Sequence, residues 1–216
     1  MWLLYHKKEG MTMTNIVTFD GKVMTDLEFS HRNRNNDFNL FHLSCKRLSG
    51  VYDEIPVVIR EDLAEKLPII KGLNIRVTGR FQSYNSKRTE DYGKRILYIN
   101  AYDVSEINKK SRTNQIELDG IICKPTTLRL TPKGKWVSDV VIKNYSGKNI
   151  YYIPCVVWGS TAKASNEMEV GEYIKIKGRI QRRDFIRFRN DEKEMHTAYE
   201  ISVCELYKEM EEESYA

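Results

Sequence analysis

The chain has 216 residues, of which 41% are hydrophobic and 30% charged, and its formal net charge is +5. This length suits two domains of about 100 residues, each able to bury its own core. The apolar stretches are too short to span a bilayer, and the first residues lack the features of a secretory signal, so composition argues against a membrane or exported protein and favours a cytoplasmic one.

The sequence repeats itself with a stride of 99 residues: Asn15 recurs as Asn114, and Gly79-Arg80 recurs as Gly178-Arg179. A stride of this length matches a complete small domain rather than a solenoid unit. We therefore predict two copies of one module. The expected segments are a leader over 1–14, domain 1 over 15–108, a linker over 109–113, domain 2 over 114–208 and a short acidic tail over 209–216.

The leader stands outside the repeat. Residues 7–10 read Lys-Lys-Glu-Gly, which a purine-rich ribosome-binding site would encode if it were translated by mistake. This pattern leads us to expect that the natural start is Met11 or Met13.

Five strands are predicted in the first repeat from alternating or continuous apolar runs, at 16–19, 38–45, 55–59, 75–81 and 97–104. The polar stretch 25–37 is predicted as a loop. Residues 61–67 begin with acids and end before Pro68, which indicates a short helix. Gly21 inside the first strand indicates a bulge or bend where another backbone comes close.

The second repeat follows the same order, with strands predicted at 116–122, 136–143, 151–158, 173–181 and 199–206 and a helix at 160–167. Five strands with one helix between strands three and four describe a Greek-key barrel, the OB-fold. The predicted fold class is therefore all-β, with two tandem five-stranded OB-fold barrels. The structural alternative is a pair of unrelated meanders.

Nothing in the sequence indicates catalysis. The histidines are scattered, no Gly-rich phosphate loop is present, and no nucleophile and base recur together in both repeats. The four cysteines are dispersed without metal-ligand spacing, so we expect reduced, mostly buried thiols. We predict no enzymatic activity, no cofactor and no metal.

Basic and aromatic side chains interleave at one place in each repeat. Residues 175–189 contain seven cations, one acid and the rings of Phe185 and Phe188, and residues 76–95 contain a similar mixture around Phe81, Tyr84 and Tyr92. Single-stranded nucleic acids need this mixture, because cations follow the phosphates while flat rings stack on bases. The alternative is a solvated hairpin whose rings cover the edge of the barrel.

Trp158 and Tyr152 lie on the same face of a predicted strand, because they are six residues apart. Ile153, Cys155 and Val157 lie on the opposite face and form a better set for a small core. The pattern therefore favours an exposed pair of rings, although both rings could also be core residues.

Several segments of the second repeat resemble the bacterial single-stranded DNA-binding protein family. They are Leu118-Asp119-Gly120, Lys124-Pro125, the runs 128–134 and 137–144, Cys155-Val156-Val157-Trp158-Gly159 and the run 170–181. The resemblance implies sequence-tolerant binding of single-stranded DNA without a cofactor. It also implies that four OB-folds cooperate, so a chain with two modules is expected to form a homodimer.

Carried over by position, the resemblance implies stacking roles for Trp158, Tyr152, Phe185 and Tyr145. The first repeat is a diverged copy, similar to primosomal OB proteins, because Arg60 stands where Trp158 does. The predicted DNA-binding residues are Trp158, Tyr152, Phe185, Tyr145, Lys135, Lys175, Lys177, Arg179, Arg182, Arg183, Arg187, Tyr52, Arg80, Tyr84, Lys87 and Arg88.

The predicted function is coating of single-stranded DNA during replication, recombination or transfer, with replication or recombination proteins as possible partners. The alternatives are an RNA-binding OB protein and a primosome-type adaptor that uses one barrel for protein contact. The tail ends in Ser214-Tyr215-Ala216 after its acids, without the Pro-Phe-type tip of the family. Recruitment of partners through the tail is therefore in doubt.

Overall fold

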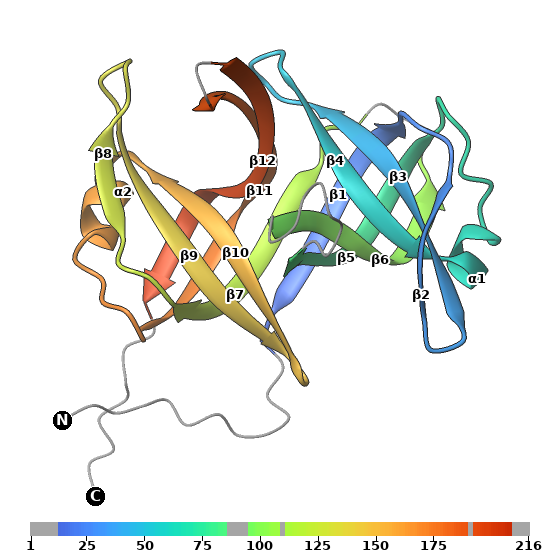
Figure 1. Cartoon of the computed structure of the whole chain (residues 1–216), viewed down its shortest axis with the longest axis horizontal. Coiled ribbons are helices and arrows are strands. Elements are labelled where there is room, and N and C mark those ends of the chain that lie inside the picture. Colours follow the sequence, from blue (N-terminus) through green and yellow to red (C-terminus); the bar gives the residue numbers. More distant parts are fainter. Residues whose placement is uncertain (1–12, 86–94, 109–110, 190–191, 209–216) are drawn as a thin grey trace, which may run out of the picture. The chain divides into compact units, whose positions relative to one another are not determined.

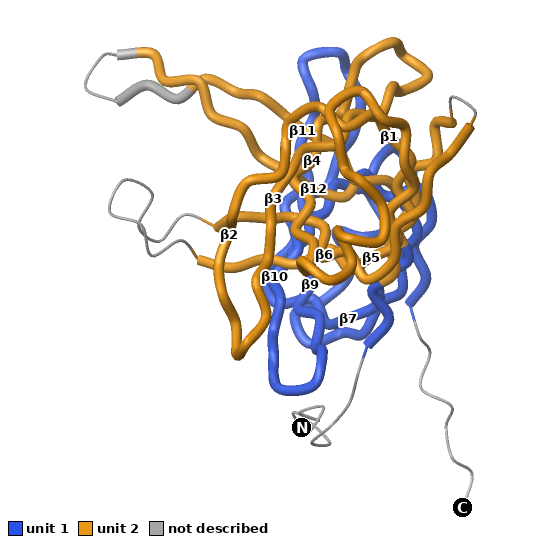
Figure 2. Tube along the Cα trace, turned by 90° about the vertical axis from the view of Figure 1, so that its right-hand side faces the viewer, with its two compact units in different colours: residues 1–15, 117–178, 202–216 blue, residues 16–116, 179–201 orange. Residues whose placement is uncertain are grey.

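The computed structural model describes residues 13–85, 95–108, 111–189 and 192–208, with side chains described except at 187–189 and 192. The chain forms two compact units, which are described separately (Figure 2). Unit 1 contains Met1–Asn15, Glu117–Gly178 and Ser202–Ala216, and unit 2 contains Ile16–Ile116 and Arg179–Ile201.

The first repeat builds the barrel of unit 2 (Figure 1). Its elements are β1 (Asn15–Val23), β2 (Glu28–Asn33), β3 (Asn36–Lys46), β4 (Tyr52–Arg60), α1 (Glu61–Ala64), β5 (Asn74–Asn85) and β6 (Arg95–Glu106). The strand order is β3-β4-β6-β5-β1, and a pairing of β1 with β3 closes the barrel. β4 and β6 run parallel and the other described pairs run antiparallel, as in an OB-fold.

The second repeat has the same succession of elements. They are β7 (Asn114–Ile122), β8 (Thr127–Leu130), β9 (Trp136–Ser146), β10 (Asn149–Trp158), α2 (Gly159–Ser165), β11 (Tyr173–Arg189) and β12 (Glu192–Lys208). The order β7-β11-β12-β10-β9, closed by β7 with β9, repeats the order of the first copy. The predicted all-β, tandem OB-fold class is therefore confirmed.

Each repeat has one strand more than predicted. β2 pairs with β3 inside the stretch 25–37 that was predicted as a loop, and β8 pairs with β9. Neither strand has a buried residue. β2 contains one apolar residue, Phe29, and β8 alternates over only four residues, so neither gives a long hydrophobic pattern from which a strand could be predicted. The helices are also shorter than predicted: α1 ends at Ala64 rather than at 67, and α2 ends at Ser165 rather than at 167.

Gly21 shows the close backbone approach predicted for the first strand of the first barrel, and Gly120 shows the same approach in the second barrel. A Cβ built on Gly21 would lie 2.9 Å from the carbonyl oxygen of Ser44, and one built on Gly120 would lie 2.6 Å from that of Lys143. Both contacts lie where the first strand meets the strand that closes the barrel. A side chain there would push the closing strands apart.

Residues 179–201 belong to the second repeat in sequence and to unit 2 in structure. They include the last part of β11 and the first part of β12, which are neighbouring strands in the sheet. The domain boundaries 15–108 and 114–208 follow the repeat and remain a prediction. The leader up to residue 12, linker residues 109–110 and the tail from 209 lie outside the described residues.

Candidate nucleic-acid interface

The outer face of β9 and β10 in unit 1 carries two of the predicted rings. Tyr152 lies opposite Lys143 in the ladder, and Tyr145 lies opposite Ile150. Cross-strand partners share a face of a sheet, so both tyrosines are on the side away from the core. Lys143 Nζ is 5.0 Å from the centroid of the Tyr145 ring, and a hydrogen bond to that side chain raises the pKa of Lys143, which keeps it cationic.

The inner face of β10 is as predicted. Ile153, Cys155 and Val157 are buried, whereas Tyr152 is half-buried and Trp158 is exposed. The core of unit 1 is thus formed without either ring. This leaves both rings in reach of a ligand.

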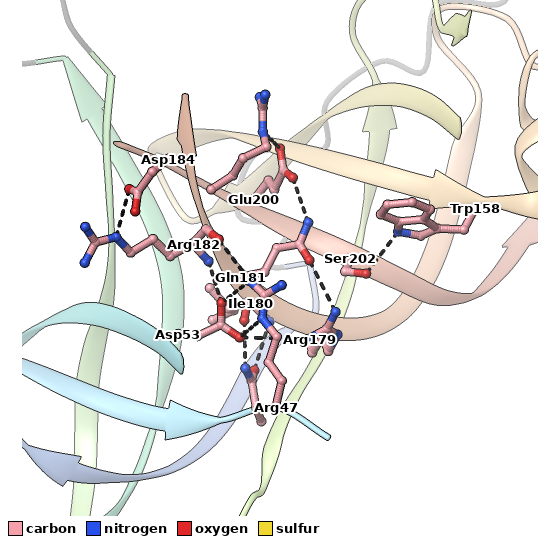
Figure 3. A network of polar contacts seen from close by, with 12 residues as sticks. Arg47, Asp53, Trp158, Arg179, Ile180, Gln181, Arg182, Asp184, Glu200 and Ser202 are labelled. Carbon is pink, nitrogen blue, oxygen red and sulfur yellow. Dashed lines mark hydrogen bonds and ion pairs between the residues drawn. The ribbon is translucent and has the colours of Figure 1, made fainter. Parts of the chain in front are cut away.

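Trp158 is held by its edge at the end of β10. Its indole Nε1–H donates a hydrogen bond of 3.1 Å to Oγ of Ser202, a buried residue on β12 (Figure 3). The side chain remains 39% exposed. A ring fixed in orientation with part of its surface exposed is suited to stacking, because less freedom is lost when a ligand binds.

A pocket of about 690 Å³ lies beside Trp158 in unit 1. Its lining residues are Gly134, Lys135, Trp136, Trp158, Gly159, Ser160 and Lys163. Lys163 Nζ lies 5.4 Å from the centroid of the Trp136 ring, within cation–π range. Lys135 and Trp158 were predicted from the sequence, whereas Trp136 and Lys163 were not, although Lys-Gly-Lys-Trp at 133–136 is itself an interleaved basic and aromatic run.

The predicted lysines of β11 are exposed in unit 1. Lys175 Nζ is 5.8 Å from the centroid of the Tyr173 ring, and Lys177 Nζ is 3.5 Å from a carboxylate oxygen of Glu117. Lys177 and Glu117 are both more than half exposed, so water weakens their attraction. Both lysines can therefore approach a phosphate.

Unit 2 contains a buried carboxylate surrounded by arginines. The Asp53 side chain is 1% exposed and accepts two hydrogen bonds from the Arg47 guanidinium, one of them 2.7 Å long. The backbone N–H of Arg182 donates to it at 2.7 Å, and Arg179 Nη1 lies 3.8 Å away (Figure 3). Buried charges require such partners. Arg179, predicted to bind DNA, thus also neutralises Asp53.

A second pocket, of about 530 Å³, lies on this carboxylate. It is lined by Cys45, Lys46, Arg47, Leu48, Ser49, Asp53, Arg112, Asn114 and Arg179. Burial and the charges of Asp53 and Asp20 raise the pKa of the Cys45 thiol to about 11, so the thiol is protonated and a poor nucleophile at neutral pH.

The predicted cations on the hairpin part of β11 also have acidic partners. Arg182 Nε donates to Asp184 at 3.0 Å, and Arg183 Nε lies 3.4 Å from Glu200. Hydrogen bonds from Thr197 and Arg182 lower the pKa of Asp184, which keeps it negative. These acidic partners offset part of the positive charge that the hairpin part of β11 presents to a ligand.

Phe185 is half-buried between a cation and another ring. Arg183 lies 5.1 Å from its centroid, and the His196 ring stacks on it at 5.7 Å. It belongs to unit 2, whereas Trp158, Tyr152 and Tyr145 belong to unit 1. The four rings implied by the resemblance are therefore divided between the units.

The first repeat also has exposed aromatic rings, but at other positions than in the second repeat. Tyr52 and Tyr84 are exposed, the first with Lys46 Nζ 5.5 Å from its centroid and the second in edge contact with Tyr98 at 5.7 Å. Arg80 is half-buried on β5. Lys87, Arg88 and the side chain of Arg187 lie outside the described residues.

Arg60 occupies in unit 2 the position that Trp158 occupies in unit 1. Each is the last residue of its strand and precedes the short helix. The Arg60 guanidinium pairs with the neighbouring Asp62, and both side chains are half exposed or more. The position therefore presents an ion pair instead of a ring.

Among the described residues, no group of three or more histidine, cysteine or acidic side chains is placed to hold a metal ion. The cysteines are free, with Cys45 and Cys155 buried, Cys123 partly buried and Cys204 exposed, so the expectation of mostly buried thiols is correct for only two. No helix in the described part of the chain is long and apolar enough to cross a membrane.

Comparison with solved structures gives matches over nearly the whole chain. The wild-type single-stranded DNA-binding protein of Thermus aquaticus matches with a TM-score of 0.77 and 16% identity, covering 95% of this chain and 98% of that one. A deletion mutant of the same protein matches with a TM-score of 0.72 and 18% identity, covering 93% and 96%.

The N-terminal domain of PriB from Thermoanaerobacter tencongensis is 36% identical over 44% of this chain and 98% of its own, with a TM-score of 0.39. No protein-family profile matches the sequence. No curated protein sequence matches it either.

The chain is thus an all-β protein of two tandem OB-folds with aromatic and basic side chains on its barrels. It shares this fold with the single-stranded DNA-binding protein of Thermus aquaticus. The OB-fold that the resemblance to single-stranded DNA-binding proteins implies is therefore confirmed.

Proposed function

We propose that this protein binds single-stranded DNA without sequence preference and protects it during replication, recombination or transfer. The observation that carries the proposal is Trp158. Its indole is anchored by Ser202 and partly exposed, on an OB-fold whose neighbouring surface carries lysines and tyrosines. Stacking on such rings is sequence-tolerant, because every base has a π-face.

The proposed contacts follow the predicted residues. In unit 1, Trp158, Tyr152 and Tyr145 stack on bases, while Lys135, Lys175 and Lys177 contact phosphates. In unit 2, Phe185, Tyr52 and Tyr84 add weaker stacking. We propose a binding protein rather than an enzyme, acting in the cytoplasm, because base stacking and phosphate contacts need no chemical step.

Fluorescence anisotropy of a labelled oligo(dT) tests the proposal. We expect binding that is weakened about tenfold by Trp158→Ala, because stacking contributes about 1–3 kcal/mol per base. The matched control is Tyr207→Ala, which removes an exposed ring of unit 1 whose hydroxyl donates to Glu205. Absence of binding at low salt, or equal binding of duplex DNA, would contradict the proposal.

The same assay separates the two other functions. An RNA-binding protein would be competed better by oligo(U) than by oligo(dT). The adaptor function is favoured by Arg60, which puts an ion pair where unit 1 has a stacking ring. If unit 2 contacts protein rather than DNA, Tyr52→Ala and Tyr84→Ala will leave oligo(dT) affinity unchanged.

We also propose a homodimer with four OB-folds, on the basis of two barrels per chain and the resemblance to proteins in which four cooperate. Sedimentation equilibrium tests this directly. A mass of twice 25.4 kDa is expected, and a monomer at micromolar concentration would contradict it.

A further inference from the structure

Trp136 lies next to Trp158 at one end of the unit 1 barrel. It is the first residue of β9, and Trp158, the last residue of β10, is opposite Val137 in the ladder. Gly159, with φ of +66°, follows Trp158 and starts α2 directly. The helix packs against β9, which brings Lys163 over the Trp136 ring.

The pocket shared by the two tryptophans has the chemistry of a nucleotide site. Its lining contains two indole rings and the two lysines Lys135 and Lys163, and no carboxylate is among its lining residues. Its volume of about 690 Å³ falls in the range of small-molecule sites. Rings suit a base and lysines suit the adjoining phosphates, so a nucleotide of a single strand is the occupant that fits both.

A purely structural role accounts poorly for Trp136. The side chain is 39% exposed, the same fraction as for Trp158, and its cross-strand partner Leu130 is 55% exposed. A tryptophan that served the core would lose most of this exposure, as the inward-facing Val140 and Ile142 of the same strand do. Trp136 therefore offers a ring to the pocket rather than to the barrel interior.

We propose that Trp136 is an additional base-stacking residue, and that Lys163 and Lys135 hold the phosphates next to the stacked base. With this site, the path of the bound DNA continues from Trp158 over the end of the barrel to α2. The inference rests on the proposed function, since it concerns the same ligand. It adds residues that the sequence resemblance does not indicate.

Single-tryptophan proteins test it, because the chain has only three tryptophans and the third is Trp2. In a Trp2→Phe background, Trp158→Phe leaves Trp136 as the only indole, and Trp136→Phe leaves Trp158. We expect oligo(dT) to quench the emission of both proteins. Stacking brings the base against the indole face, so quenching of each emission reports on its own ring.

Affinity provides the second readout. Trp136→Ala is expected to weaken oligo(dT) binding about tenfold, while Trp136→Phe, which keeps a ring, largely restores it. Lys163→Ala should reduce the slope of log affinity against log salt by about 0.7, the value for one phosphate contact on a single strand. Tyr207→Ala serves as the control and should change neither quantity.

The outcomes distinguish this inference from the function on which it rests. If Trp158 is quenched, Trp136 is not, and Trp136→Ala binds like the unaltered protein, the stacking role of Trp136 is overturned and DNA binding stands. If no variant and no unaltered protein binds oligo(dT), the proposed function itself fails. Should Trp136→Ala not fold, Trp136→Phe and the emission of Trp136 decide the question.

Discussion

The backbone N–H of Arg182 donates a 2.7 Å hydrogen bond to the side-chain carboxylate of Asp53, a residue of the other repeat. The same carboxylate is held by the guanidinium of Arg47, which also donates at 2.9 Å to the carbonyl oxygen of Arg182. Asn114 adds a pair of hydrogen bonds to the backbone of Ile180. These bonds hold the start of the 179–201 segment, at Ile180 and Arg182, in unit 2.

Asp53→Ala is expected to lower the free energy of unfolding by about 3 kcal/mol, because it leaves the partly buried guanidinium of Arg47 without its carboxylate. Urea unfolding measured by circular dichroism gives the value. Asp37→Ala is the matched control, since Asp37 also pairs with an arginine, Arg32, but the Arg32 side chain is 70% exposed, so water weakens the pair and the loss should be much smaller. Equal losses in the two variants would contradict the importance of the buried pair.

Stability is expected to fall on acidification partly through Asp20. Burial alone would raise the pKa of this fully buried carboxyl, but hydrogen bonds from Arg76, Ser111 and Thr113 outweigh it and lower the pKa. A lowered folded pKa means that the unfolded chain takes up the proton first. The contribution of Asp20 to the stability of the fold is therefore complete above about pH 3.9, the usual pKa of an aspartate. It is lost as the pH falls through the lower pKa that Asp20 has in the folded protein.

The test for Asp20 is the pH dependence of unfolding by urea between about pH 2 and pH 6. Asp20→Asn should be less stable at neutral pH and should show a shallower loss of stability on acidification. If the variant lost stability on acidification as steeply as the unaltered protein, Asp20 would not contribute to that loss.

Gly120→Ala is expected to lower stability by about 2 kcal/mol, because its Cβ would lie 2.6 Å from the carbonyl oxygen of Lys143 at the closure of the unit 1 barrel. Gly147→Asn is the control. Gly147 has φ of +58° and open space around it, and asparagine tolerates that conformation. Thermal denaturation should therefore separate the two variants.

Cations with and without close acidic partners should contribute differently to DNA binding. Lys135→Ala is expected to reduce the salt slope by about 0.7, the value for one phosphate. Arg182→Ala should reduce it less, because Arg182 is already bonded to Asp184 and lies 3.9 Å from Glu54. Salt titrations of oligo(dT) affinity measure both, and a larger change for Arg182 would contradict the argument.

Local patterns were sufficient to predict the barrels. The strand at 173–181, the glycine at 21 and the core set of β10 were predicted from neighbouring residues, and the structure confirms them. β2 and β8 were missed because β2 has one apolar residue, Phe29, and β8 alternates over only four residues, none of them buried.

The features of the site that were not predicted depend on contacts between residues that are distant in the sequence. No local pattern shows that Asp53 neutralises Arg179, because these residues belong to different repeats. Nor does one show that Glu200 faces Arg183, because that pair depends on how β11 pairs with β12. Trp136 was read as the start of a strand, which it is. Its place beside Trp158 depends on strand register and on the position of α2.

Quenching of tryptophan emission by oligo(dT), measured across salt concentrations, tests the central proposal most directly. We predict strong quenching at low salt that is largely lost in Trp158→Phe/Trp136→Phe, and a linear decrease of log affinity with log salt of about 0.7 per phosphate contacted. Emission that is unchanged by oligo(dT) at low salt would contradict single-stranded DNA binding by this surface.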